Sequence, residues 1–236
     1  MGQGYRCIIV DSKIALQNQG IPIYKKDPIK QLNEGKELVI APKQEDILQK
    51  GKEIEDKELR ALYFFLYQTG ARISEALALK FGDVNEKSLE RHRYAEARVT
   101  TLKNRKKGLR YIPIPLYIST EAQMFEYFND LYSIRINDVF MNVGTRNNVW
   151  DKFHKQISFR CEVQDLKSKT ISMKEMPLHP HLLRHFRLTH LVTIYNYNVF
   201  QLMEFAGWSD TRQATTYVGL SSSYLAQPFA SYKAKR

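Results

Sequence analysis

The sequence has little cysteine and no long apolar run. Cys7 and Cys161 lie far apart in the chain and match no metal-ligand spacing. We therefore expect two buried thiols rather than a disulfide or a cysteine-based metal site. No apolar stretch is long enough to cross a membrane, and no signal-peptide pattern is present. These absences predict a soluble, cytoplasmic protein.

Acidic residues are also scarce relative to basic ones. The 236 residues include 36 Lys and Arg but only 25 Asp and Glu, so the formal net charge is +11 and the pI is about 9.5. This excess favours a polyanionic partner, nucleic acid before membrane. A cationic membrane helix is the competing interpretation, but the chain has no long apolar run. The length allows one sizeable domain, or one domain with a small appendage, and a hydrophobic content of 43% is enough for a buried core.

Hydrophobic periodicity predicts a mainly helical fold with a small antiparallel β-sheet, of the α+β class. Apolar residues recur at helical spacing in six segments: 55–67, 73–79, 119–132, 147–159, 180–195 and 199–205. Residues 94–101 and 109–116 instead read as two strands of a hairpin, and Pro113 and Pro115 place the second strand at an edge. Residues 164–174 are polar and predict a loop. Trp150 and Phe153 are expected in the core.

The stretch from 179 to 217 carries most of the candidate chemistry. Pro180 suits the first turn of a helix, in which His181, Arg184 and His185 fall three and four residues apart on one face. The next helix ends at Gly207, where a left-handed C-cap costs little. A tryptophan, Trp208, and a tyrosine ten residues after Gly207, Tyr217, follow.

These residues resemble the C-terminal signature of the tyrosine recombinases, the phage integrase family. That signature is His-x-x-Arg-His, then Gly-His or Gly-Trp, then a nucleophilic tyrosine at about this spacing. Residues 69–77, TGARISEAL, are similar to the family's upstream Thr-Gly-x-Arg-x-Ser-Glu-x-Leu box and lie about a hundred residues before His181. Two boxes in the family's order make the resemblance specific.

The resemblance implies site-specific cleavage and rejoining of DNA through a 3′-phosphotyrosyl intermediate. The implied catalytic residues are Arg72, Lys103, His181, Arg184, Trp208 and Tyr217. The physical reason is that a phosphorane carries extra negative charge, which two planar guanidiniums and further hydrogen-bond donors can stabilise. Glu75 would hold or orient Arg72, and His185 would orient groups or transfer a proton. The tyrosyl linkage conserves the bond energy, so ATP is not expected. With positive side chains in the place of a metal, no divalent ion is expected either.

The turn between the two predicted strands is strongly basic. Its positive side chains are Lys103, Arg105, Lys106 and Lys107, followed by Arg110. Such a turn suits a DNA groove, and we expect these five residues to bind DNA. In the family, a lysine on this hairpin protonates the leaving 5′ oxygen. Lys103 fits that role best, and Lys106 or Lys107 remains an alternative.

The resemblance also predicts the domain organisation. The catalytic domain should span residues 38–236, with a C-terminal tail from about 219 whose apolar residues permit packing on a neighbouring protomer. A tetramer on double-stranded DNA is then expected. Residues 1–37 are too few for the helical core-binding domain that usually precedes the catalytic one.

Three other functions fit parts of the pattern. His181 and His185 form a legitimate i, i+4 metal pair, and His179 and His190 lie nearby, but the glutamate of a metallopeptidase motif is missing. A catalytically silent DNA-binding protein could use the same scaffold, although every expected charged position is filled. A type IB topoisomerase shares the chemistry, but this chain is short for an encircling clamp.

Overall fold

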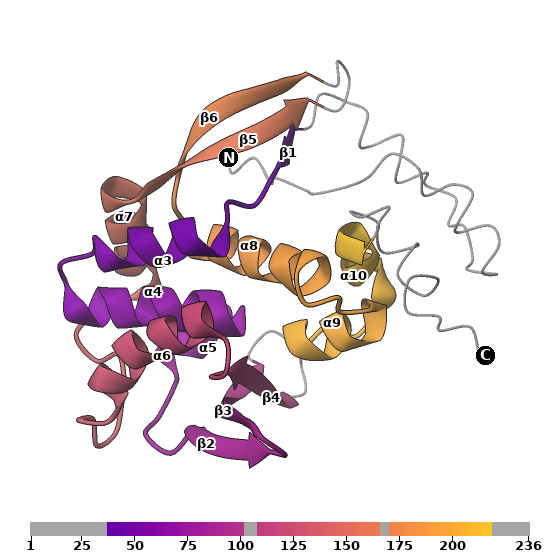
Figure 1. Ribbon diagram of the computed structural model, residues 1–236. Helices are drawn as coiled ribbons and strands as arrows, with labels where there is room; N and C mark the ends of the chain where they lie inside the picture. Colours follow the sequence, from indigo (N-terminus) through magenta and orange to yellow (C-terminus); the bar gives the residue numbers. More distant parts are fainter. Residues whose placement is uncertain (1–36, 102–107, 166–169, 219–236) are drawn as a thin grey trace, which may run out of the picture.

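The computed structural model describes residues 37–101, 108–165 and 170–218. Two nearly fully buried helices, α4 (Lys57–Thr69) and α8 (Pro180–Thr193), lie side by side at its centre (Figure 1). Helix α4 begins where Asp56 accepts hydrogen bonds from the backbone amides of residues 58 and 59. It also packs against α6 (Ser119–Tyr132), and α3 (Gln44–Lys52) contacts both α4 and α6.

Two antiparallel sheets lie at opposite ends of this helical body (Figure 1). One has the order β2-β3-β4 and contains β2 (Val84–Leu89), β3 (His92–Thr101) and β4 (Gly108–Pro115). The β3–β4 pairing runs from Tyr94 opposite Pro115 to Thr101 opposite Gly108, so the predicted hairpin and the edge position of its second strand are both confirmed.

The second sheet has the order β1-β5-β6 and contains β1 (Glu37–Val39), β5 (Ser158–Asp165) and β6 (Ile171–Pro177). Here the predictions of a helix to 159 and a loop over 164–174 were wrong. Helix α7 (Arg146–Gln156) ends earlier, and Phe159, Cys161 and Val163 are buried in alternation with exposed residues, which is the period of a strand. Strand β6 is exposed along most of its length, so it carries no apolar alternation that sequence could reveal.

The remaining helices are short, and two of them pack against α8. They are α5 (Ile73–Leu77), α9 (Val199–Ala206) and α10 (Thr211–Val218). Helix α10 packs against both α8 and α9 (Figure 1). The C-cap of α9 is Gly207 in the left-handed conformation, with φ of 67°, as the sequence predicted.

Several single-residue predictions can be compared with the burial of side chains. Phe153 is in the core, but Trp150 is 43% exposed and stacks on His154, so its assignment to the core was wrong. Cys161 is a buried free thiol, as predicted, whereas Cys7 lies outside the described residues. Among the described helices, none is both long and apolar enough to span a membrane.

Candidate functional site

Helix α8 supplies three of the candidate residues. His179 caps the helix by accepting a hydrogen bond from the Leu182 amide at 3.1 Å, and the proline that follows it occupies the first turn. His181 is exposed, whereas Arg184 and His185 are 2% and 8% exposed. The helix therefore presents one of these side chains to solvent and holds the other two against its neighbours.

Arg184 is anchored by backbone carbonyls at the ends of two helices. Its Nη1 donates to the carbonyl of Gly70, just after α4, and its Nη2 donates to the carbonyl of Ala206, at the end of α9, at 2.7 Å. Its guanidinium also lies 5.6 Å from the ring centroid of Trp208. Each of these helices ends at a left-handed glycine, Gly70 or Gly207, so the chain turns sharply where the guanidinium sits.

Tyr217 extends from α10 into the same cluster. Its hydroxyl lies 2.9 Å from Nδ1 of His185, a hydrogen-bonding distance. Its ring stacks on the indole of Trp208, with centroids 5.8 Å apart and an interplanar angle of 25°. Tyr217, Trp208 and Arg184 therefore form one stacked series, with His185 at the hydroxyl of the tyrosine.

Glu75 joins two arginines from different elements. Its Oε1 accepts from Nη1 of Arg72 at 2.9 Å, and its Oε2 accepts from Nη2 of Arg110 at 2.6 Å. The backbone amide of Arg72 also donates to Oε2, at 2.9 Å. The contact between Glu75 and Arg72 that the sequence predicted is present, and Arg110 is a second cation on the same carboxylate.

The cluster carries more positive than negative charge. Burial, followed by the positive charges of Arg110 and Arg72, lowers the pKa of Arg184 to about 9, and Glu75 and Tyr217 act in the opposite direction. Burial also lowers the pKa of Arg110, with Glu75 opposing this effect. Three guanidiniums thus lie near one carboxylate, which two of them contact, and such a group is stabilised by an added anion.

The electrostatics of His185 favour its neutral form. Burial, with smaller contributions from the charges of His181 and His179, lowers the pKa of His185 to about 4. A neutral imidazole carries one proton, so one ring nitrogen can accept a hydrogen bond. Nδ1 can fill that role toward the Tyr217 hydroxyl.

The structure brings most of the predicted residues together but not all. One connected group contains Arg72, Glu75, Arg184, His185, Trp208 and Tyr217. His181 lies one turn before His185 on α8. Lys103, Arg105, Lys106 and Lys107 lie outside the described residues.

Arg110 does not share the exposed hairpin position that the sequence suggested. It is 4% exposed and lies on the inner face of β4, in alternation with the buried residues Ile112 and Ile114. That alternation was available in the sequence, but the positive charge of Arg110 favoured a surface assignment.

A buried polar network behind the site was not foreseen from sequence. Arg187, one turn after Arg184 on α8, is 1% exposed and forms an ion pair with Glu121 on α6, which is 0% exposed. Glu121 also accepts from Gln68 Nε2 at 3.0 Å and from the Tyr195 hydroxyl at 2.8 Å. The signal available in sequence was a charged residue within an otherwise apolar helical pattern.

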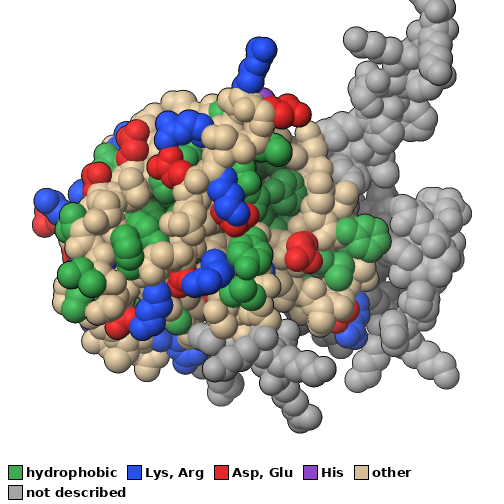
Figure 2. All heavy atoms as spheres, turned by 90° about the horizontal axis from the view of Figure 1, so that it is seen from below, with side chains coloured by type: hydrophobic (Ala, Val, Ile, Leu, Met, Phe, Trp, Pro, Cys, Tyr) green, Lys and Arg blue, Asp and Glu red, His purple; other side chains and the backbone are tan. Residues whose placement is uncertain are grey.

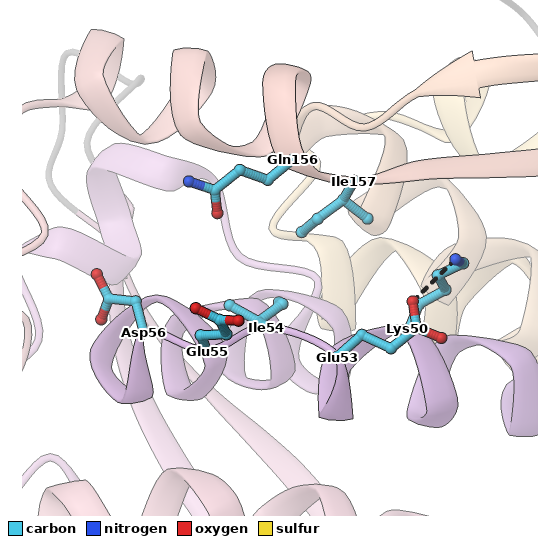
Figure 3. Close-up of a pocket in the computed structure, with 7 residues that line it drawn as sticks. All are labelled: Lys50, Glu53, Ile54, Glu55, Asp56, Gln156 and Ile157. Carbon is cyan, nitrogen blue, oxygen red and sulfur yellow. Dashed lines mark hydrogen bonds and ion pairs between the residues drawn. The ribbon is translucent and has the colours of Figure 1, made fainter.

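Two other features of the described residues lie apart from this cluster. No group of three or more His, Cys, Asp and Glu side chains in the described part of the chain is placed to hold a metal ion. A hollow of about 410 Å³ is lined by the α3–α4 junction and the end of α7 (Figure 3), with Glu53, Glu55 and Asp56 among its lining residues. Its acidic lining is unfavourable for a phosphate.

The surface charge is mixed where the β2-β3-β4 sheet lies. Figure 2 shows basic, acidic and hydrophobic side chains interspersed on this face. Three basic side chains of the sheet form ion pairs with acidic ones: Arg93 with Glu86, Lys87 with Glu96 and Arg98 with Asp83. Most of the chain's excess positive charge instead lies in the segments outside the described residues, including 102–107.

Solved structures with a similar fold include two recombinases and a transposon integrase. The XerH recombinase bound to palindromic difH substrate matches with a TM-score of 0.54 and 18% identity, over 90% of this chain and 56% of that one. The Tn1549 transposon integrase in complex with transposon right end DNA matches with a TM-score of 0.52 and 16% identity, over 92% and 74%. The XerA recombinase matches with a TM-score of 0.50 and 16% identity, over 84% and 64%.

The sequence itself places the chain in a family. This chain spans about half to two thirds of the length of the first Xer recombinase structures that it matches. No curated protein matches it by sequence. The family model described as the phage integrase family matches residues 39–223. With the mainly helical fold and the two sequence boxes, this match establishes that the chain belongs to the phage integrase family of tyrosine recombinases.

Proposed function

We propose that this protein is a site-specific DNA recombinase that cleaves and rejoins strands through Tyr217. The observation that carries the proposal is the position of the Tyr217 hydroxyl, 2.9 Å from Nδ1 of His185, in a cluster with excess positive charge. A nucleophile beside a neutral base suits attack on a phosphodiester. The neighbouring guanidiniums outnumber the carboxylates in the cluster and can stabilise the negative charge of the phosphate.

In the first step, the Tyr217 oxygen attacks the scissile phosphorus and the bond to the 5′ oxygen breaks. His185 accepts the phenolic proton at Nδ1, and Lys103 donates a proton to the leaving 5′ oxygen. The products are a 3′-phosphotyrosyl linkage and a free 5′ hydroxyl. In the second step, the 5′ hydroxyl of a partner strand gives its proton to Lys103 and attacks the same phosphorus, the bond to Tyr217 breaks, and His185 returns its proton to the Tyr217 oxygen.

The arginines of the cluster would stabilise the phosphorane between these steps. Arg184 already donates two N–H groups to backbone carbonyls, so its plane is fixed before DNA arrives. Arg72 is held by Glu75 in the same way. His181 and Trp208 would donate further hydrogen bonds to the phosphate oxygens. Fixed donors of this kind lower the barrier without reorganising during the reaction.

Double-stranded DNA is the proposed substrate, and a homotetramer on DNA is the proposed assembly. The XerH and Tn1549 integrase structures were both determined with bound DNA, which supports the choice of partner. The excess of basic residues in 102–107 supports contact with phosphates. Because the chemistry uses only side chains, neither ATP nor a divalent ion is required in this proposal.

Covalent capture of DNA tests the proposal. The probe is a pool of nicked duplexes with a randomised central sequence, labelled at the 5′ end of the nicked strand and incubated with the full chain in EDTA. Release of the short fragment beside the nick prevents religation, so a cleaved strand stays attached to protein. Denaturing electrophoresis should then show a slower labelled band, and sequencing of the captured strands would reveal the preferred site.

The decisive variant is Tyr217→Phe, which should bind the duplexes but capture none. Tyr224→Phe and Tyr232→Phe are matched controls, because each removes one phenolic hydroxyl from the same end of the chain. Capture that persists in Tyr217→Phe would assign the nucleophile elsewhere. Tight binding without any captured strand in the wild type would favour a catalytically silent DNA-binding protein.

A further inference from the structure

Arg110 lies on strand β4 and joins this strand to helices α5 and α9. It is 4% exposed, and its two terminal nitrogens contact different elements. Nη2 donates to Oε2 of Glu75 on α5 at 2.6 Å, and Nη1 donates to the carbonyl of Phe205 on α9 at 2.9 Å. A planar guanidinium that binds two acceptors in different directions fixes both relative to its own strand.

The contact with Phe205 places Arg110 at the same helix end that Arg184 binds. The two arginines donate to consecutive carbonyls at the C-terminus of α9, those of Phe205 and Ala206. A helix C-terminus carries partial negative charge and unpaired carbonyls, which cations stabilise. Trp208 follows two residues later and stacks on Tyr217, so the end of α9 determines where that ring lies.

The contact with Glu75 extends the same effect to Arg72. Glu75 is 3% exposed and accepts from both arginines, one on each carboxylate oxygen. Without Arg110, one oxygen of this buried carboxylate would keep only the backbone amide of Arg72. Glu75, which holds the Arg72 side chain, would then no longer be fixed by its hydrogen bond from Arg110.

We infer that Arg110 is a positioning residue that fixes Arg72, through Glu75, and Trp208, through the end of α9, relative to strand β4. The inference rests on the function proposed above. It replaces the prediction that Arg110 contacts DNA, because Arg110 is buried on the inner face of β4 and not on the exposed turn where that prediction placed it. Nothing in this role requires Arg110 to touch the substrate.

The test separates the rate of capture from the affinity for DNA. Arg110→Met removes the charge and both contacts, and Arg110→Lys keeps the charge but cannot donate to both acceptors in one plane. Arg98→Met is the matched control, because Arg98 lies opposite Tyr111 in the same sheet and pairs with Asp83, but its side chain is 52% exposed. Single-turnover capture of the randomised nicked duplexes is measured at saturating protein, with affinity measured over a range of salt concentrations.

Arg110→Met should capture DNA about 100-fold more slowly than wild type, because small displacements of positioned groups reduce rates by about this factor. Its affinity and the salt dependence of its binding should stay close to the wild-type values. Arg110→Lys should recover about tenfold of the lost rate, since the charge beside Glu75 is restored but one contact is not. Arg98→Met should leave the rate unchanged.

Each other outcome overturns the inference. A wild-type capture rate in Arg110→Met, or in Arg110→Lys should the methionine variant fail to fold, would show that the position of Arg110 does not matter for the chemistry. A salt slope reduced by about one with an unchanged rate would identify a direct phosphate contact. If wild type captures no DNA at all, the proposed function fails and the inference falls with it.

Discussion

The hydroxyl of Tyr217 lies 2.9 Å from Nδ1 of His185, although the two residues are 32 positions apart in the chain. Burial of His185 lowers its pKa to about 4, so at neutral pH the imidazole is uncharged and one nitrogen can accept a proton. This pairing gives the tyrosine a base within one hydrogen bond. It also defines the first prediction.

Replacing His185 with glutamine should slow covalent capture by roughly 100-fold or more, because glutamine can accept a hydrogen bond but cannot take the proton. Since the folded-state pKa is below its ordinary value, His185 stays neutral above about pH 6 and becomes protonated only as the pH falls toward 4. The contribution of His185 to the wild-type rate should therefore be constant from pH 6 to 8. Single-turnover rates across this range measure both effects, and equal rates for the two proteins would remove His185 from the chemistry.

Arg184→Lys should abolish most of the capture activity even though the charge is kept. The guanidinium donates to Gly70 and Ala206 and lies over the ring of Trp208, a geometry that one ammonium cannot reproduce. We expect a loss of roughly 100- to 1,000-fold in rate, the range for removing a fixed donor to a developing negative charge. A lysine variant with the wild-type rate would show that charge alone is sufficient.

Gly207→Ala and Gly82→Ala form a matched pair of backbone variants. Both glycines have positive φ, 67° and 91°, so each alanine should cost about 1 to 2 kcal/mol of folding free energy. A Cβ at Gly207 would lie 3.2 Å from Cδ of Arg110, whereas no described atom lies within 4 Å of a Cβ at Gly82. Capture should therefore slow in Gly207→Ala and remain normal in Gly82→Ala. Urea unfolding and capture rates measure the two effects, and an equal loss of rate in both would contradict the crowding argument.

The buried ion pair of Arg187 and Glu121 should matter far more for stability than an exposed pair. Glu121→Gln leaves the fully buried Arg187 without its counter-ion, which should cost about 3 to 5 kcal/mol in the free energy of unfolding. Asp83→Asn removes the partner of the half-exposed Arg98 and should cost far less, because solvent screens an exposed pair. Urea denaturation of both variants measures the difference. Similar losses would mean that Arg187 gains compensating partners or water.

The resemblance to the family's two boxes singled out the residues that gather around Tyr217, and local signals in the sequence predicted the helix ends that hold them. Pro180 begins α8 and Gly207 ends α9 where expected. Gly70 ends α4, so that Arg72 lies at the start of α5. These features depend on the conformational limits of proline and glycine, which act over a few residues.

The contacts among buried side chains that support the cluster could not be predicted from such local signals. Arg110 meets Glu75 across 35 positions and Arg187 meets Glu121 across 66 positions, and the sequence pattern of either residue alone does not identify its partner. The β5–β6 hairpin was missed for a different reason, because β6 is exposed on both faces along most of its length and lacks an apolar alternation.

The most direct test of the account is to locate the covalent bond between protein and DNA. Trypsin cleavage after Arg212 and Lys233 yields one peptide that contains Tyr217, Tyr224 and Tyr232, so fragmentation of the captured peptide must assign the modified side chain. The account predicts that the nucleotide remnant is attached to Tyr217 through its 3′ phosphate. A remnant on Tyr224 or Tyr232, or a 5′-phosphate linkage, would contradict it.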